Sequence, residues 1–112
     1  MSPITTHVLD TRLGRPAAGV AVVLEKFDAG AWQPIGLGAT NADGRLTTLL
    51  AEGALTAGRH RLTFDTGAYF QQQGVEHFYP SVTIDFEVAD PTQHYHVPLL
   101  LSPFGYSTYR GS

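Results

Sequence analysis

Apolar and polar residues alternate along most of the chain, which predicts a protein built mainly of β-strands. Residues 81–89 are apolar at every second position, and residues 59–65 alternate in the same way apart from His60. A period of two is typical of antiparallel strands that bury one face. Residues 20–27 are apolar at both parities up to Glu25, which predicts a strand covered on both faces. Further strands are expected at residues 4–10, 32–39, 94–102 and 105–110.

One segment, residues 66–74, breaks this alternation and predicts a short helix of about two turns. It ends at Gly74, and Asp65 or Thr66 can cap its first turn. The sequence 41–44, Asn-Ala-Asp-Gly, is typical of a turn. Several short strands with one short helix predict a mostly β protein, an antiparallel β-sandwich.

Composition is consistent with a single globular domain over residues 1–112. Hydrophobic residues make up 43% of the chain and charged residues 15%, against about 25% charged in an average domain. The absence of cysteine excludes disulfides, thiol catalysis and cysteine-based metal sites. A net charge of −3 with a single lysine, Lys26, disfavours nucleic acid as a partner, because that affinity comes from clustered cations.

The hydropathy of the chain gives no indication of a membrane or a secretory route. No basic segment followed by an apolar one opens the sequence, so no signal peptide is predicted. The longest apolar run covers residues 97–101, far below the roughly 20 residues that span a bilayer. We therefore expect a cytoplasmic protein without a membrane partner.

Two histidines near the C-terminus are candidates for chemistry. His94 and His96 are spaced by two, so on a strand both imidazoles share a face. With His7 as a third ligand they could hold a catalytic zinc ion, although no carboxylate reinforces that pattern. The alternative is that both are polar residues on a solvent-exposed face.

Four segments, in chain order, resemble the transthyretin-related proteins. They are residues 7–11 (HVLDT), 14–17 (GRPA), 41–45 (NADGR) and 94–112, which ends in YRGS. That terminal tetrapeptide is similar to the one that marks the enzymatic branch of the family, the 5-hydroxyisourate hydrolases. The resemblance covers essentially the whole chain and implies a transthyretin-like β-sandwich.

The resemblance also implies which residues are functional, namely His7, Arg45, His96 and the tetrapeptide that contains Tyr109 and Ser112. Transthyretin itself, a hormone carrier, differs at three of these positions: lysine, glutamate and threonine match His7, Arg45 and His96. A small-ligand carrier is therefore disfavoured, and it remains the alternative to an enzyme.

Strand parity predicts where these side chains lie. His7 shares a face with Leu9, and His96 shares one with Pro98 and Leu100, so we expect them, with Tyr109, on the outer face of one sheet. This face is too apolar for open water. The resemblance implies that it is covered in a homotetramer, whose facing sheets form a channel that holds the sites.

The implied reaction is hydrolysis of 5-hydroxyisourate to 2-oxo-4-hydroxy-4-carboxy-5-ureidoimidazoline during urate degradation. We expect His96 to be the base that activates water, with His7 as its partner, although the two roles could be exchanged. Arg45 would bind ring carbonyls and the developing oxyanion. Tyr109 and Ser112 would close the pocket, Ser112 through its hydroxyl or a carboxylate. Neither a metal nor a cofactor is expected; a zinc hydrolase on His7, His94 and His96 is a further alternative.

Overall fold

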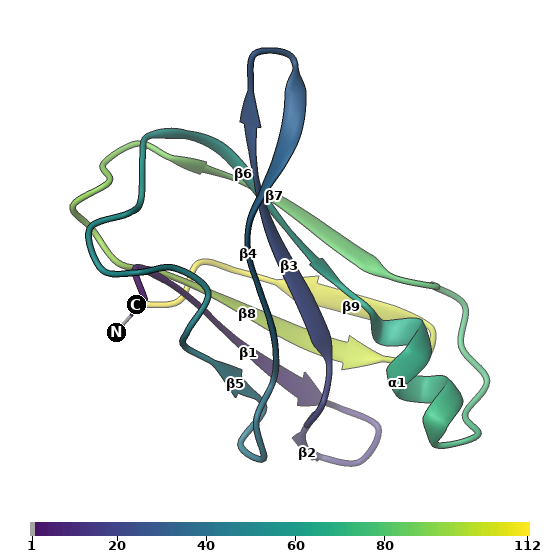
Figure 1. The fold of residues 1–112 in the computed structure, drawn as a ribbon. Helices are drawn as coiled ribbons and strands as arrows, with labels where there is room; N and C mark the ends of the chain where they lie inside the picture. Colours follow the sequence, from purple (N-terminus) through teal and green to yellow (C-terminus); the bar gives the residue numbers. More distant parts are fainter. Residues whose placement is uncertain (1) are drawn as a thin grey trace.

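The computed structural model describes residues 2–112 and consists, within them, of nine strands and one helix (Figure 1). In chain order the elements are β1 (Ile4–Asp10), β2 (Arg15–Pro16), β3 (Ala21–Asp28), β4 (Ala31–Ala39), β5 (Arg45–Leu46), β6 (Gly58–Phe64), α1 (Thr66–Gln72), β7 (Val82–Val88), β8 (Tyr95–Ser102) and β9 (Gly105–Thr108). The strands predicted from alternation are all present, and the predicted turn at residues 41–44 leads into β5.

The strands form two sheets that pack face to face. One sheet has the order β2-β1-β8-β9, with β5 also paired to β1, and the other has the order β4-β3-β6-β7. All neighbouring strands are antiparallel except β1 and β8. This arrangement confirms the mostly β sandwich with one short helix.

The parallel pairing of β1 with β8 is the feature of the fold that alternation did not predict. The two strands are paired along their length, from Ile4 opposite Tyr95 to Asp10 opposite Leu101. Because they are far apart in the sequence, no hairpin constrains their relative direction. The pairing places the start of the chain beside its last third.

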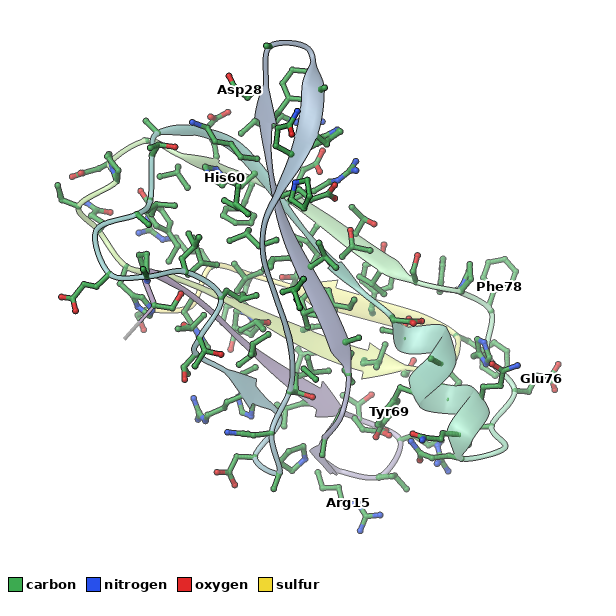
Figure 2. All side chains as sticks on the ribbon, in the orientation of Figure 1. Arg15, Asp28, His60, Tyr69, Glu76 and Phe78 are labelled. Carbon is green, nitrogen blue, oxygen red and sulfur yellow. The ribbon has the colours of Figure 1, made fainter. Side chains whose placement is uncertain are left out.

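The core lies between the sheets and is made by alternate residues of both. In β1 and β8 these include Val8, Val97 and Leu99, and in β6 and β7 they include Leu62 and Val82, all buried. His60, labelled in Figure 2, is also fully buried. Its ring stacks on the ring of Phe86. The same parity that fills the core sends the intervening side chains to the outer faces.

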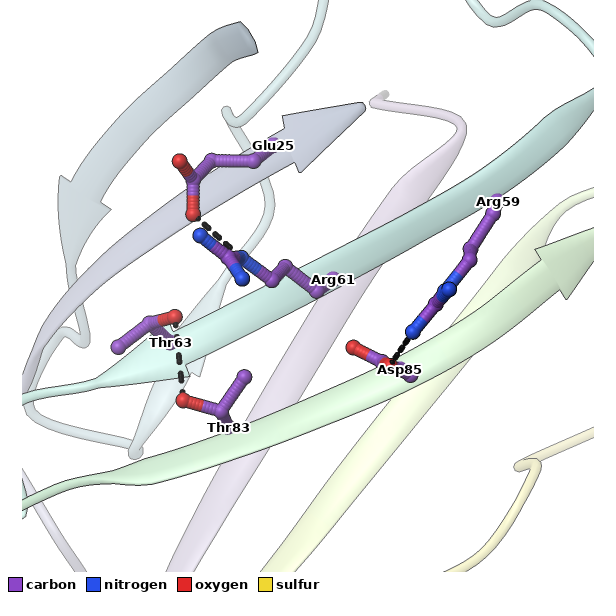
Figure 3. A network of polar contacts seen from close by, with 6 residues as sticks. All are labelled: Glu25, Arg59, Arg61, Thr63, Thr83 and Asp85. Carbon is purple, nitrogen blue, oxygen red and sulfur yellow. Dashed lines mark hydrogen bonds and ion pairs between the residues drawn. The ribbon is translucent and has the colours of Figure 1, made fainter. Parts of the chain in front are cut away.

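The prediction that residues 20–27 are covered on both faces is wrong. Val22 and Leu24 are buried, whereas Val23 is only half-buried and Phe27 is exposed. The second face of β3 belongs to the outer surface of its sheet, where side chains form polar pairs instead of a second core. Figure 3 shows these pairs: Arg61 with Glu25, Arg59 with Asp85, and Thr63 with Thr83.

Helix α1 confirms the predicted break in alternation, ending two residues earlier than expected. Asp65 caps it by accepting a hydrogen bond from the Ala68 amide at 3.2 Å. Phe70 is buried against the core, and the Tyr69 hydroxyl donates to the Asp10 carboxylate at 2.7 Å. These contacts attach the helix to the end of β1. Within residues 2–112 the helical structure is too short to traverse a lipid bilayer.

Candidate active site

The outer face of the β1–β8 sheet gathers the predicted functional residues. His7 of β1 lies opposite Arg45 of β5, and Thr5 of β1 lies opposite His96 of β8. Paired residues in a ladder project to the same side of the sheet. His7, Arg45 and His96 therefore share one face, with His7 one diagonal step along the sheet from His96.

A polar cavity of about 250 Å³ opens on this face. Its lining residues are Thr5, Thr6, Arg45, Thr47, His94, His96 and Ser112, all of them polar or charged. The volume suits a small ligand, since sites for drug-sized molecules begin at about 300 Å³. Hydrogen-bond donors from three strands and from the C-terminal segment therefore surround a space that fits a compact polar molecule.

His96 is held on two sides of its ring. Its Nδ1 atom lies 2.8 Å from the Thr5 hydroxyl, and its Cδ2 edge faces the backbone of Gly111. Burial lowers the pKa of His96, and the charges of Arg45, His7 and His94 lower it further. These effects outweigh the hydrogen bond to Thr5, which raises the pKa, so the neutral imidazole, which can accept a proton, is the favoured form.

The C-terminal segment reaches the cavity by continuing along β8 beyond β9. The Gly111 amide donates to the His96 carbonyl at 2.8 Å in an isolated antiparallel bridge. A Cβ atom on Gly111 would lie only 2.6 Å from Cδ2 of His96, so only glycine lets the segment approach the ring this closely. The guanidinium of Arg110 lies 4.5 Å from the centre of the Tyr95 ring. These contacts bring Ser112 to the wall of the cavity.

Two of the predicted residues do not line this cavity within one chain. His7 lies beside it, next to Arg45 in the ladder. Tyr109 is 59% exposed and lines a neighbouring hollow together with His96 and Phe86. In a single chain Tyr109 therefore does not close the pocket as expected. Strand β9 ends at Thr108, so Tyr109 no longer follows the strand's alternation of faces.

The three histidines do not form the metal site that their spacing suggested. His94 and His96 stack with ring centres 6.5 Å apart and both contact Thr5, while His7 lies outside the cavity that they line. Among residues 2–112, no three or more His, Asp or Glu side chains are arranged to hold a metal ion. This geometry gives the three-histidine zinc site no support.

Thr5 is the site residue that sequence reasoning missed. It is 3% exposed, and its hydroxyl contacts both His94 and His96. Strand parity does predict that Thr5 shares a face with His7, because the two residues are two positions apart. Threonine is so common in strands, however, that its position on this face does not mark it as a functional residue.

Comparison with known proteins finds relatives along essentially the whole chain. The HIUase/Transthyretin family model matches residues 4–111. A 5-hydroxyisourate hydrolase of Ralstonia nicotianae is 49% identical over 117 residues, which cover 100% of this chain and 100% of that protein. The sequence predicted a hydrolase, and this relative is named as one.

Solved structures of both branches of the family are similar to this one. The 5-hydroxyisourate hydrolase of Klebsiella pneumoniae is 40% identical with a TM-score of 0.85, covering 97% of this chain and 98% of its own. Sea bream transthyretin in complex with thyroxine is 36% identical with a TM-score of 0.92, covering 97% and 94%. The backbone is thus common to a 5-hydroxyisourate hydrolase and to a transthyretin that binds thyroxine. By sequence, by fold and by the matched residues 4–111, the chain belongs to the HIUase/Transthyretin family.

Proposed function

We propose that this protein hydrolyses 5-hydroxyisourate to 2-oxo-4-hydroxy-4-carboxy-5-ureidoimidazoline. The observation that carries the proposal is the convergence of a neutral, partly buried imidazole, His96, and a guanidinium, Arg45, on one small polar cavity. Hydrolysis of a ring amide needs a base for water and a donor for the developing oxyanion, and these two groups supply both. The activity named for the 49% identical relative supports the same reaction.

In the proposed reaction, His96 takes a proton from a water molecule as the water oxygen bonds to the ring carbonyl carbon. The carbonyl oxygen becomes an oxyanion that accepts hydrogen bonds from Arg45. When the oxyanion collapses, the carbon–nitrogen bond breaks and the ring opens. The proton held by His96 then passes to the departing nitrogen. The sum is the addition of one water across an amide bond, which requires no metal, cofactor or covalent intermediate.

The remaining residues are assigned supporting roles. His7 lies opposite Arg45 and diagonally from His96, where it can orient the substrate or exchange the role of base with His96. Ser112 lines the cavity and is placed to bind a polar substituent of the substrate. Tyr109 is assigned to substrate binding from a neighbouring subunit or after closure of the C-terminal segment.

We further propose a homotetramer, in which facing outer sheets form a channel that contains the sites. The outer face carries Leu9 and Leu100, which are half-buried in a single chain. The cavity at Thr5, Arg45 and His96 on the same face is open to solvent. A second sheet laid on this face would cover the apolar side chains and exclude water from the cavity, which strengthens its electrostatic interactions.

The direct test is to add the protein to freshly generated 5-hydroxyisourate and follow its absorbance. We expect decay at a catalytic protein concentration to exceed the spontaneous rate by orders of magnitude. A non-catalytic carrier, the alternative that the sea bream transthyretin likeness keeps open, would bind stoichiometrically without faster decay. Elemental analysis and exhaustive chelation in the same assay test whether hydrolysis depends on a metal.

A further inference from the structure

The hydroxyl of Thr5 contacts two imidazoles at once. Its Oγ1 atom lies 2.8 Å from Nδ1 of His96 and 3.0 Å from Nε2 of His94. Thr5 is 3% exposed, so little solvent competes for these bonds. Both distances are those of real hydrogen bonds.

A hydroxyl has a single hydrogen, and this limits what the two rings can be. If Thr5 donates to His94, its oxygen must accept a hydrogen from Nδ1 of His96. If Thr5 donates to His96 instead, Nε2 of His94 must carry the hydrogen. The oxygen can also accept from both rings, but its one hydrogen cannot serve two lone pairs, so at least one of Nδ1 of His96 and Nε2 of His94 must carry hydrogen. The two tautomers are in this sense coupled through one oxygen atom.

His96 keeps a free lone pair, and so can act as a base, only when its Nδ1 carries the hydrogen. With hydrogen on Nδ1, the lone pair of His96 is on Nε2, and no hydrogen bond from residues 2–112 engages that atom. In the other arrangement the Nδ1 lone pair is occupied by Thr5 and Nε2 carries hydrogen. The backbone of Gly111 lies against Cδ2 of His96 and restrains the ring. Gly111 is held there because its amide is hydrogen-bonded to the His96 carbonyl.

We propose that Thr5 and His94 are positioning residues that hold His96 in its Nδ1–H tautomer. Nδ1–H of His96 donates to Thr5, and Thr5 donates to Nε2 of His94. His94 is exposed, so the hydrogen on its own Nδ1 is satisfied by water. When His96 accepts a proton at Nε2, its Nδ1–H bond to Thr5 strengthens, because the donor becomes charged. This proposal rests on the proposed role of His96 as the base.

The tautomer can be measured without any substrate. Two-bond ¹⁵N–¹H NMR of histidine rings in the intact protein, at a pH where His96 is neutral, distinguishes Nδ1–H from Nε2–H. We expect His96 to be protonated at Nδ1 and His94 to be unprotonated at Nε2. Finding His96 protonated at Nε2 would overturn the proposal whatever the activity of the protein.

Variants test the coupling. Thr5→Val removes the hydroxyl at nearly constant shape and should shift His96 toward Nε2–H. Partners that orient a functional histidine are worth about 10–100-fold, so kcat should fall by that order with KM little changed. Thr5→Ser keeps a hydroxyl and should restore both tautomer and kcat. His94→Phe removes the acceptor and should shift the His96 tautomer in the same direction.

Thr11→Val is the matched control, since Thr11 also bonds across the β1–β8 pair, to the Leu101 carbonyl at 3.0 Å, away from the site. It should change neither the tautomer nor kcat. An unchanged His96 tautomer in folded Thr5→Val would refute the coupling even if hydrolysis is confirmed. Conversely, an Nδ1–H tautomer in a protein that does not hydrolyse 5-hydroxyisourate would refute the proposed function and leave the coupling intact.

Discussion

At the scale of single residues, the environment of His96 determines what the site can do. Burial and three neighbouring cationic or titratable side chains lower its pKa, and Thr5 fixes one edge of its ring. The resemblance alone pointed to His7, Arg45 and His96, and the structure places all three on one sheet face. It did not point to Thr5, whose importance comes from a contact across 91 residues of sequence.

The lowered pKa of His96 predicts the pH dependence of activity. A base must be neutral, and its pKa lies below the ordinary value of 6.5, so protonation sets in only in more acidic solution. We expect kcat/KM to be level at neutral and mildly alkaline pH and to decline in an acid limb whose midpoint lies below 6.5. An acid limb with its midpoint above 6.5 would contradict the assignment of His96 as the base.

Replacing Arg45 by lysine separates the contribution of its charge to activity from that of its planar shape. Arg45→Lys keeps the positive charge but loses the planar pair of donors that a guanidinium offers to a carbonyl. Loss of an oxyanion donor costs about 10²–10³ in kcat, so we expect a loss of that order. Arg15→Lys, a change on exposed β2, is the control and should be neutral. Full activity in Arg45→Lys would show that charge alone suffices.

At the scale of elements, period-two alternation predicted the seven longer strands and its interruption predicted the helix, but the two-residue strands β2 and β5 and the pairing of the strands were not predicted. The direction of β1 relative to β8 follows from packing between segments that no local pattern connects. Burial of the second face of β3 was overestimated, because apolar residues at both parities do not reveal whether another layer exists. The isolated bridge between Gly111 and His96 of β8 was not predicted.

That bridge predicts the effect of adding a single methyl group. Gly111→Ala would place Cβ 2.6 Å from Cδ2 of His96, so the imidazole or the C-terminal segment must move. We expect kcat to fall by about 10²-fold, since small misplacements of catalytic groups cost that much, with little change in melting temperature.

Gly105→Ala is the matched control in the same hairpin. Its Cβ would meet only the Ser102 hydroxyl, at an ordinary 3.7 Å. It should leave both activity and melting temperature unchanged. If the two variants behave alike, the close approach of Gly111 to His96 has no functional role.

At the scale of the whole molecule, the proposed tetramer would complete the site. In a single chain Tyr109 is exposed, and Leu9 and Leu100 on the outer face are only half-buried. Sequence parity could indicate that this face needs covering, but the covering surface in the proposed tetramer depends on contacts between chains, which no pattern within one chain specifies.

The assembly itself can be measured by light scattering. We expect a mass of four copies of the 12.1 kDa chain at micromolar concentration. Leu100→Arg, which places a charge on the outer face, should dissociate the tetramer and reduce activity together. A monomer with full activity would contradict a site that depends on facing sheets.

The most direct test of the central claim is the turnover of 5-hydroxyisourate by His96→Ala compared with the unchanged protein. Removing a general base typically costs about 10²–10⁴ in rate. The account predicts a fall in kcat of that order, with the circular dichroism spectrum and oligomeric state preserved. An unchanged kcat in folded His96→Ala would show that hydrolysis does not proceed through this imidazole.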